Sequence, residues 1–218
     1  MAQSSKVGRP SRGDRNPDTV KTEILNAAME EFARHGLEAA STRMIAVQAG
    51  VTKAMIHYYF KTKEGLYRAV LENVFNGLLT LVEQGDFLEM PPADALEQFV
   101  RQVLLVESAH PHLHRMLFQE TIQNQSKYYK EMDVGRLVYG TLSRILDRGI
   151  STGIFRPLNP QHTAVNIMGV CTFYFGAQDS LQHLFQDQPL LSPAMLEQHT
   201  QEAIALIMAG VLQHSTAN

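Results

Sequence analysis

The chain has 218 residues, 44% of them hydrophobic, so it can bury a core in one or two domains. Its net charge of −3 excludes a surface that is basic throughout, but the charge is unevenly divided. Residues 1–70 contain 11 Lys and Arg against 7 Asp and Glu, a net +4, whereas residues 71–218 contain 8 against 15, a net −7. A basic first third on an acidic remainder predicts a localised phosphate-binding face, with chance segregation of charge as the alternative.

Nothing in the sequence indicates secretion or a membrane span. The first residues carry charges but no apolar core segment, which argues against a signal peptide. Residues 157–178 lack Asp, Glu, Lys and Arg, yet Asn159, His162 and Asn166 would make membrane insertion costly. Cys171 is the only cysteine, which excludes an intrachain disulfide and fits a reducing cytosol. We therefore expect a cytoplasmic protein without a membrane segment.

Residues 1–16 are polar and basic, and they cannot form a core, so we expect a flexible arm. Gly8-Arg9-Pro10 and the following Arg12 resemble arginine arms that enter an AT-rich minor groove, which is narrow and strongly negative. A solvated tail is the alternative interpretation.

The first helix is predicted to begin near Pro17, with Asp18 or Thr19 as its N-cap, and to end at Gly36. Apolar residues repeat along it at helical spacing. These residues are Ile24, Leu25, Ala27, Ala28 and Phe32.

Thr42 to Phe60 has the pattern of two short helices joined by a tight turn. The first would end at Gly50, because glycine accepts the left-handed backbone that terminates a helix. Thr52 would cap the second through its hydroxyl group. A helix this short and polar, held by its partner, fits a DNA major groove. Any two short helices joined by glycine give a similar pattern, so the flanking sequence has to decide.

The second short helix would present its polar side to bases, while flanking residues hold phosphates. Lys63 starts the next helix, where a cation opposes the helix dipole unless a phosphate lies nearby. The candidate DNA-binding residues are Arg9, Arg12, Thr42, Thr52, Lys53, Ala54, His57, Tyr58, Tyr59 and Lys63.

The rest of the chain is predicted to be helical. A long helix from Thr62 to about Gln84 would connect a small N-terminal head to a larger body. The body helices are expected over residues 93–109, from 111 with a break near 124, over 133–149, from 160 to about 185 and from 193 to about 213. We see no strand-like alternation, so the fold class is all-α, with about nine helices.

The stretch from Thr22 to Val70 resembles the TetR family of one-component repressors. The motifs are ILNAA, a phenylalanine, HG, IA, AGV, an aromatic pair before a phenylalanine, and K-x-KE-x-L, in that order. His57 is a departure, because the family usually has tyrosine there. The resemblance implies a flexible arm (1–16), a helix-turn-helix domain (17–65) and a ligand-binding and dimerisation domain (66–218). It also implies a homodimeric repressor that binds a pseudo-palindromic operator and is released by a small molecule.

We expect an effector cavity between the far half of the long helix and the helices that carry Tyr139 and Cys171. Because few charges lie there, the effector should be largely apolar. Its walls would be Phe118, Tyr139, Cys171 and Tyr174, with His114 and Gln178 as polar anchors. The dimer should pack the apolar stripes of the last two helices, formed by Phe175, Leu181, Leu184, Ile204, Ile207 and Val211.

Two rival hypotheses remain. The spacing of His110, His112 and His114 suggests a helical metal-binding protein or enzyme, although Pro111 would place the first histidine outside a helix. The body could instead bind a partner protein and sense nothing. We find no nucleotide-binding, metalloprotease or hydrolase motif, and the sequence requires no cofactor and no catalysis.

Overall fold

The computed structural model describes residues 16–186 and 188–213, and this part of the chain is all α-helical. Eleven α-helices and one 3₁₀ helix are found there, and the only β-type pairing among these residues is an isolated bridge between Phe155 and Leu212. The order is α1 (Pro17–Ala39), α2 (Thr42–Gln48), α3 (Lys53–Phe60), α4 (Lys63–Gln84), α5 (Pro92–Ala109), α6 (Leu113–Asn124), α7 (Lys127–Glu131), α8 (Val134–Ser151), α9 (Pro160–Gly176), α10 (Gln178–Leu181), η1 (Gln182–Phe185) and α11 (Pro193–Val211).

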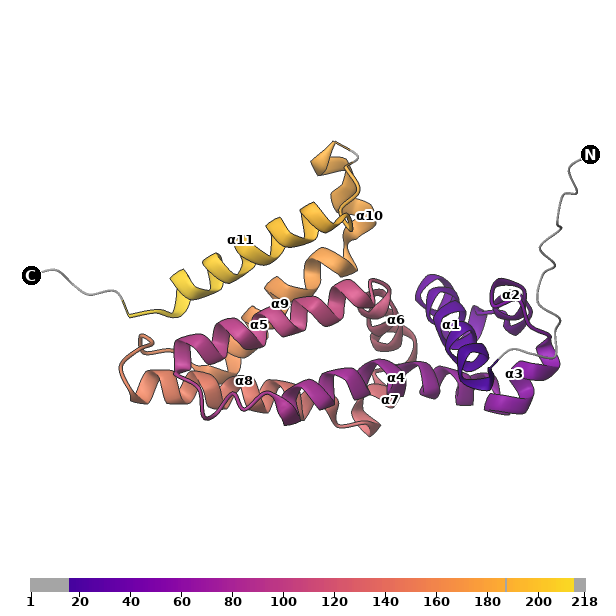
Figure 1. The fold of residues 1–218 in the computed structure, drawn as a ribbon, viewed down its shortest axis with the longest axis horizontal. Coiled ribbons are helices and arrows are strands. Elements are labelled where there is room, and N and C mark those ends of the chain that lie inside the picture. The colour runs from indigo at the N-terminus through magenta and orange to yellow at the C-terminus, as the bar shows by residue number, and fades with distance from the viewer. Residues whose placement is uncertain (1–15, 187, 214–218) are drawn as a thin grey trace, which may run out of the picture.

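Helices α1 to α3 form a head at one end of the molecule, and the remaining helices form a body (Figure 1). Helix α4 starts in the head and continues into the body, so it crosses the predicted domain boundary at residue 65. The described residues contain no helix with both the length and the apolar character needed to cross a bilayer.

Local capping chemistry fixes the ends of the head helices. Asn16, and not the predicted Asp18 or Thr19, caps α1, because its side-chain oxygen accepts the backbone N–H of Asp18 at 2.9 Å. Thr52 and Thr62 cap α3 and α4 through their hydroxyl groups, at 3.3 Å and 2.9 Å. The predicted starts of these two helices are therefore confirmed.

Two glycines with positive φ shape the head. Gly50 has φ 63° and ends α2, as predicted. Gly36 has φ 72° and ψ 177°, which interrupts α1 before a last short piece up to Ala39. The neighbouring helix α6 lies so close that a Cβ at Gly36 would stand 1.9 Å from Oε1 of Gln123.

Two helix ends in the body differ from the predictions. Helix α6 begins at Leu113 and not at Pro111, and it ends near the predicted break, where Gln125 takes φ 52°. Helix α9 ends at Gly176, well before residue 185, because the backbone leaves helical geometry at Ala177. The ring of Phe118 fills the space that a Cβ at Gly176 would need. The chain then continues as the short α10 and η1.

Replacement of Gly36 by Ala should destabilise the protein by about 1–3 kcal/mol, because its φ and ψ lie in a region that side chains avoid. The measurement is urea unfolding, and the matched control is Gly77→Ala. Gly77 lies in α4 with open space around its would-be Cβ, so the alanine should stabilise the helix by up to about 1 kcal/mol. Equal unfolding midpoints for the two variants would contradict this account of Gly36.

Candidate DNA-binding interface

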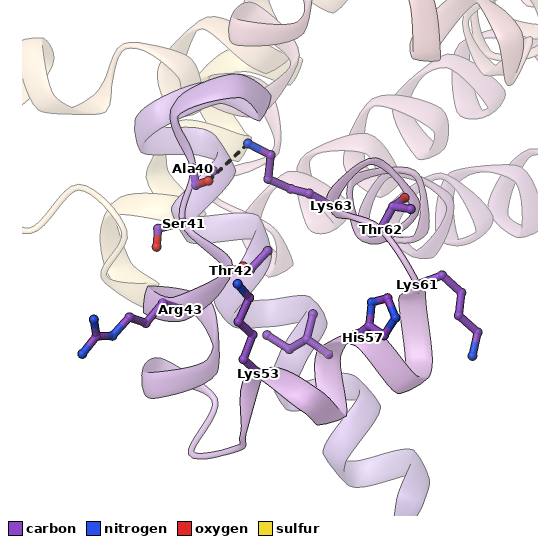
Figure 2. A pocket seen from close by; sticks show the side chains of 10 residues that line it. Ala40, Ser41, Thr42, Arg43, Lys53, His57, Lys61, Thr62 and Lys63 are labelled. Atoms are coloured by element: carbon purple, nitrogen blue, oxygen red, sulfur yellow. Dashed lines mark hydrogen bonds between the residues drawn. The ribbon is translucent and has the colours of Figure 1, made fainter.

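A hollow of about 410 Å³ opens on the head between the start of α2, the helix α3 and the start of α4 (Figure 2). Four of the ten residues that line it are Lys or Arg, and none is Asp or Glu. The lining residues are Ala40, Ser41, Thr42, Arg43, Lys53, Ile56, His57, Lys61, Thr62 and Lys63. The hollow therefore has the composition that a phosphate group requires.

Helix α3 turns the predicted reading residues outward. Lys53, Ala54, His57 and Tyr58 are all exposed, and the exposed fraction of Tyr58 is 71%. The opposite side of the helix packs into the core of the head through Ile56 and Phe60, as predicted. This division follows from the spacing of apolar residues in a helix anchored on one side.

Lys63 makes contacts that the sequence did not indicate. Its Nζ donates to the carbonyl oxygen of Glu38 at 2.6 Å and lies 3.4 Å from that of Ala40. Figure 2 shows the second of these bonds, which ties the start of α4 to the end of α1. An ammonium group has three N–H donors, so the third remains compatible with the predicted phosphate contact.

Two cations of the hollow were not among the predicted site residues. Arg43 and Lys61 lie on opposite sides of it (Figure 2). Lys61 occupies the tight connection between α3 and α4 with φ 63°, and its Nζ donates to the carbonyl oxygen of Tyr58 at 3.0 Å. Their positions directly after Thr42 and Phe60 could have revealed them, because each follows a predicted contact or helix end.

The remaining predicted DNA contacts differ in accessibility. The Thr52 hydroxyl already serves as the cap of α3. Tyr59 is half-buried, and its ring packs edge-on against Tyr58 with the centroids 5.3 Å apart. Arg9 and Arg12 lie outside the residues that the structure describes.

A carboxylate that the sequence analysis did not select shapes the same interface. Glu31 of α1 is buried, and its Oε1 accepts the backbone N–H of Ser41 at 2.9 Å. Ser41 in turn caps α2 by accepting the N–H of Met44. Glu31 thereby holds the first turn of α2 at the edge of the hollow.

The predicted effector residues divide into two groups. Cys171 lies near Tyr139 and also near Glu107, whose Oε2 is hydrogen-bonded to Nδ1 of His114 at 2.7 Å. Burial, and then the charge of Glu107, raises the pKa of the Cys171 thiol to about 12. Burial likewise raises the pKa of Tyr139. Cys171 is fully buried here, whereas Tyr139 is half-buried.

The other predicted effector residues have different surroundings, although the ring of Phe118 lies beside that of His114, with the centroids 6.2 Å apart. Tyr174 faces α11, because its hydroxyl donates to the carbonyl oxygen of Leu190 at 2.9 Å and its ring stacks on His199. Phe118 is 47% exposed, so its side chain does not line an enclosed cavity. Gln178 is half-buried in α10, after the end of α9. Tyr174 is therefore directed toward α11, and the single cavity lined by all six residues stays a prediction.

The prediction of the dimer residues is mostly wrong, because most of these side chains belong to the core of a single protomer. Helix α11 packs on α5 and α9, and these contacts bury four of the six side chains. The buried four are Phe175, Ile204, Ile207 and Val211. Leu181 is half-buried, and only Leu184 is open to solvent.

The rival metal hypothesis finds no support in the described part of the chain. No group of three or more His, Cys, Asp or Glu side chains there could hold a metal ion. His114 is paired with Glu107, and burial lowers the pKa of both His110 and His112. His110 and His114 both lie near the Glu107 carboxylate, but the described residues do not complete a set of metal ligands there.

Comparison with solved structures supports the same fold. KstR2 of Mycobacterium tuberculosis, described as a ketosteroid transcriptional regulator, has a TM-score of 0.74 at 20% identity, over 93% of this chain and 98% of that one. HlyIIR, a hemolysin II transcriptional regulator, has a TM-score of 0.65 at 22% identity, over 91% of this chain and 100% of that one.

Sequence comparison establishes the family. A family model described as bacterial regulatory proteins, tetR family, matches residues 24–70, and one described as tetracyclin repressor-like, C-terminal domain, matches residues 92–207. The transcriptional regulator RutR of Escherichia coli K12 is 30% identical over 146 residues, which cover 65% of this chain and 67% of RutR. The transcriptional repressor NicS of Pseudomonas putida is 27% identical over 177 residues, 79% of this chain and 82% of NicS. The chain therefore belongs to the TetR family of DNA-binding transcriptional regulators.

Proposed function

We propose that this regulator represses transcription as a homodimer on a pseudo-palindromic operator and that a small molecule releases it. The observation that carries the DNA contact is the cationic hollow beside the exposed side of α3. Helix α3 would enter the major groove with Lys53, Ala54, His57 and Tyr58 toward the bases. The adjoining phosphates would be held by Thr42, Arg43, Tyr59, Lys61 and Lys63. Thr52 would fix the N-terminus of α3. Arg9 and Arg12 would enter the minor groove.

The operator can be obtained by selecting bound fragments from random DNA with the purified full-length protein. We expect two half-sites whose centres lie one helical turn of DNA apart, about 34–36 Å, or somewhat more. Recovery of no shared sequence, with equal binding to all fragments, would contradict a sequence-specific regulator.

Replacement of Lys63 by Ala should weaken binding to all DNA sequences about equally and lower the salt slope of binding by roughly one, because one phosphate contact is lost. The variant should also unfold at a lower temperature, since two backbone carbonyls lose their donor. The control is Arg136→Ala, which removes one charge from an exposed position of the body. An unchanged salt slope would limit Lys63 to its structural contact.

His57 should determine sequence preference, because it lies on the exposed side of α3 and lines the hollow. His57→Ala should change the order of affinity among selected operators while leaving nonspecific binding nearly unchanged. His57→Tyr, which restores the residue usual in the family, should favour a different set of sites. If selection returned the same sequences for all three proteins, His57 would not contact bases.

We propose a dimer surface different from the predicted one. Val165 and Phe173 of α9 and Leu206 of α11 are exposed, and we call this the α9–α11 face. A groove of about 190 Å³ runs between the two helices, and Val170 and Gly210 are among its lining residues. Two copies of this face would form a four-helix interface and cover apolar surface that a monomer leaves in water.

Leu206→Asp should dissociate the dimer and leave the protomer folded, because Leu206 is 64% exposed in the protomer but would be buried between two copies. Sedimentation at micromolar concentration measures the dimer, and circular dichroism measures the fold. Ile207→Asp should unfold the protein instead, since that side chain is only 5% exposed. Ile122→Asp, on the exposed side of α6, is the control and should remain dimeric. A dimeric Leu206→Asp variant would refute this interface.

The effector is proposed to bind beside Tyr139 and Cys171, where burial provides an apolar surrounding and the Glu107–His114 pair provides one polar contact. It should therefore be largely apolar with a single polar group. A screen for compounds that raise the unfolding temperature, followed by operator binding with each hit, tests this proposal. Tyr139→Trp should abolish the response to a hit and keep operator binding. A parental response in that variant would place the effector elsewhere.

A further inference from the structure

A buried carboxylate lies where α6 and α7 meet the first turns of α4. The side chain of Glu120 is fully buried. Its Oε2 accepts the hydroxyl of Tyr67 at 2.9 Å and the side-chain amide of Asn124 at 2.6 Å, and its Oε1 accepts the backbone N–H of Tyr128 at 2.7 Å. Among the described residues no Lys or Arg forms an ion pair with it, so three neutral donors hold the carboxylate in place.

Tyr67 connects this carboxylate to the head. Its fully buried ring packs edge-on against Phe32 of α1, with the centroids 4.9 Å apart, and against Tyr128 of α7, at 5.3 Å. Burial, and then the charge of Glu120, raises the pKa of Tyr67 above its ordinary value, so the hydroxyl keeps its proton and remains a donor. The head helix α1, the connecting helix α4 and the body helices α6 and α7 therefore meet around one side chain.

Two outer contacts enclose the same corner. The guanidinium of Arg68 lies 4.7 Å from the centre of the Tyr128 ring and pairs with Glu131 at 2.6 Å. On the other side, α6 approaches the kink of α1, where Gln123 occupies the space beside Gly36. The head thus contacts α6 and α7 at one corner, which we call the α6–α7 corner. Hydrogen bonds to Glu120 lie at its centre, and packed aromatic side chains surround them.

A polar centre restricts movement in a way that apolar packing alone does not. Apolar side chains attract one another without directional preference, so helices that meet only through them can slide by small amounts. A shift of α4 against α6 would lengthen the bond from Tyr67 to Glu120 and leave a buried carboxylate short of a donor, which is costly. The corner should therefore hold α4 at one angle to the body.

We infer that Glu120 is a positioning residue for operator binding, which acts through Tyr67 to set the angle of the head on the body. This inference rests on the proposed function, because a set angle matters only if two heads must reach two half-sites at one spacing. Heads that rotate freely would lose conformational entropy when they bind DNA, which would lower the affinity. They would also bind half-sites at a wrong spacing.

The test compares wild type with Tyr67→Phe on the selected operator and on operators with one base pair added or removed between the half-sites. Tyr67→Phe deletes only the hydroxyl and keeps the ring that packs on Phe32 and Tyr128. We expect affinity for the intact operator to fall about tenfold or more, nonspecific affinity and its salt slope to stay unchanged, and the preference for one spacing to weaken. Glu120→Gln, which alters the acceptor and keeps the shape, should give the same pattern.

Tyr128→Phe is the matched control. It also removes a tyrosine hydroxyl from this corner, but it keeps the bond to Glu120, because that bond comes from the backbone N–H of Tyr128. It should retain the wild-type affinity and spacing preference. Failure of wild type to select any DNA would refute the proposed function itself. If wild type selects an operator but Tyr67→Phe and Glu120→Gln keep its affinity and spacing preference, the inference alone is overturned. It is also overturned if both variants lose affinity only through unfolding, as judged by circular dichroism at the assay temperature.

Discussion

The continuity of α4 is the constraint on which the rest of this molecule depends. One helix of 22 residues, about 33 Å long, begins beside the cationic hollow and ends in the body. Its first residue, Lys63, bonds the end of α1, Tyr67 enters the corner with Glu120, and Leu78 is buried further along. Because a helix is stiff, any displacement of its far half must move its near half as well, and the α6–α7 corner decides how much displacement is tolerated.

The division of charge along the chain becomes a division in space. The head combines a cationic hollow with an exposed recognition helix, whereas the body buries its few central charges as hydrogen-bonded or paired carboxylates, namely Glu107 and Glu120. Each has a hydrogen-bond partner on another helix, since an unpaired buried charge is costly. A small molecule could release the DNA only by binding one arrangement of these helices more tightly than another.

The starts of α3 and α4 and the end of α2 in the head could be predicted because their signals are local. Thr52 and Thr62 cap helices through neighbouring N–H groups, and Gly50 ends one through its own φ, so a few adjacent residues suffice. The body could not be predicted to that depth. Helix α11 has apolar side chains on more than one side, so the sequence cannot distinguish Ile207, which is buried, from Leu206, which is exposed. Lys63 and Glu120 bond groups 25 and 53 residues away, and no local pattern encodes such contacts.

The central claim is that the hollow between α2, α3 and α4 holds operator phosphates while α3 reads the bases. The most direct measurement is phosphate-ethylation interference on the selected operator, with wild type and with Arg43→Ala. The account predicts two groups of blocking phosphates related by the operator's two-fold axis, and weakened interference at one phosphate of each group in the variant. Interference patterns that are identical for the two proteins, or that lack two-fold symmetry, would contradict it.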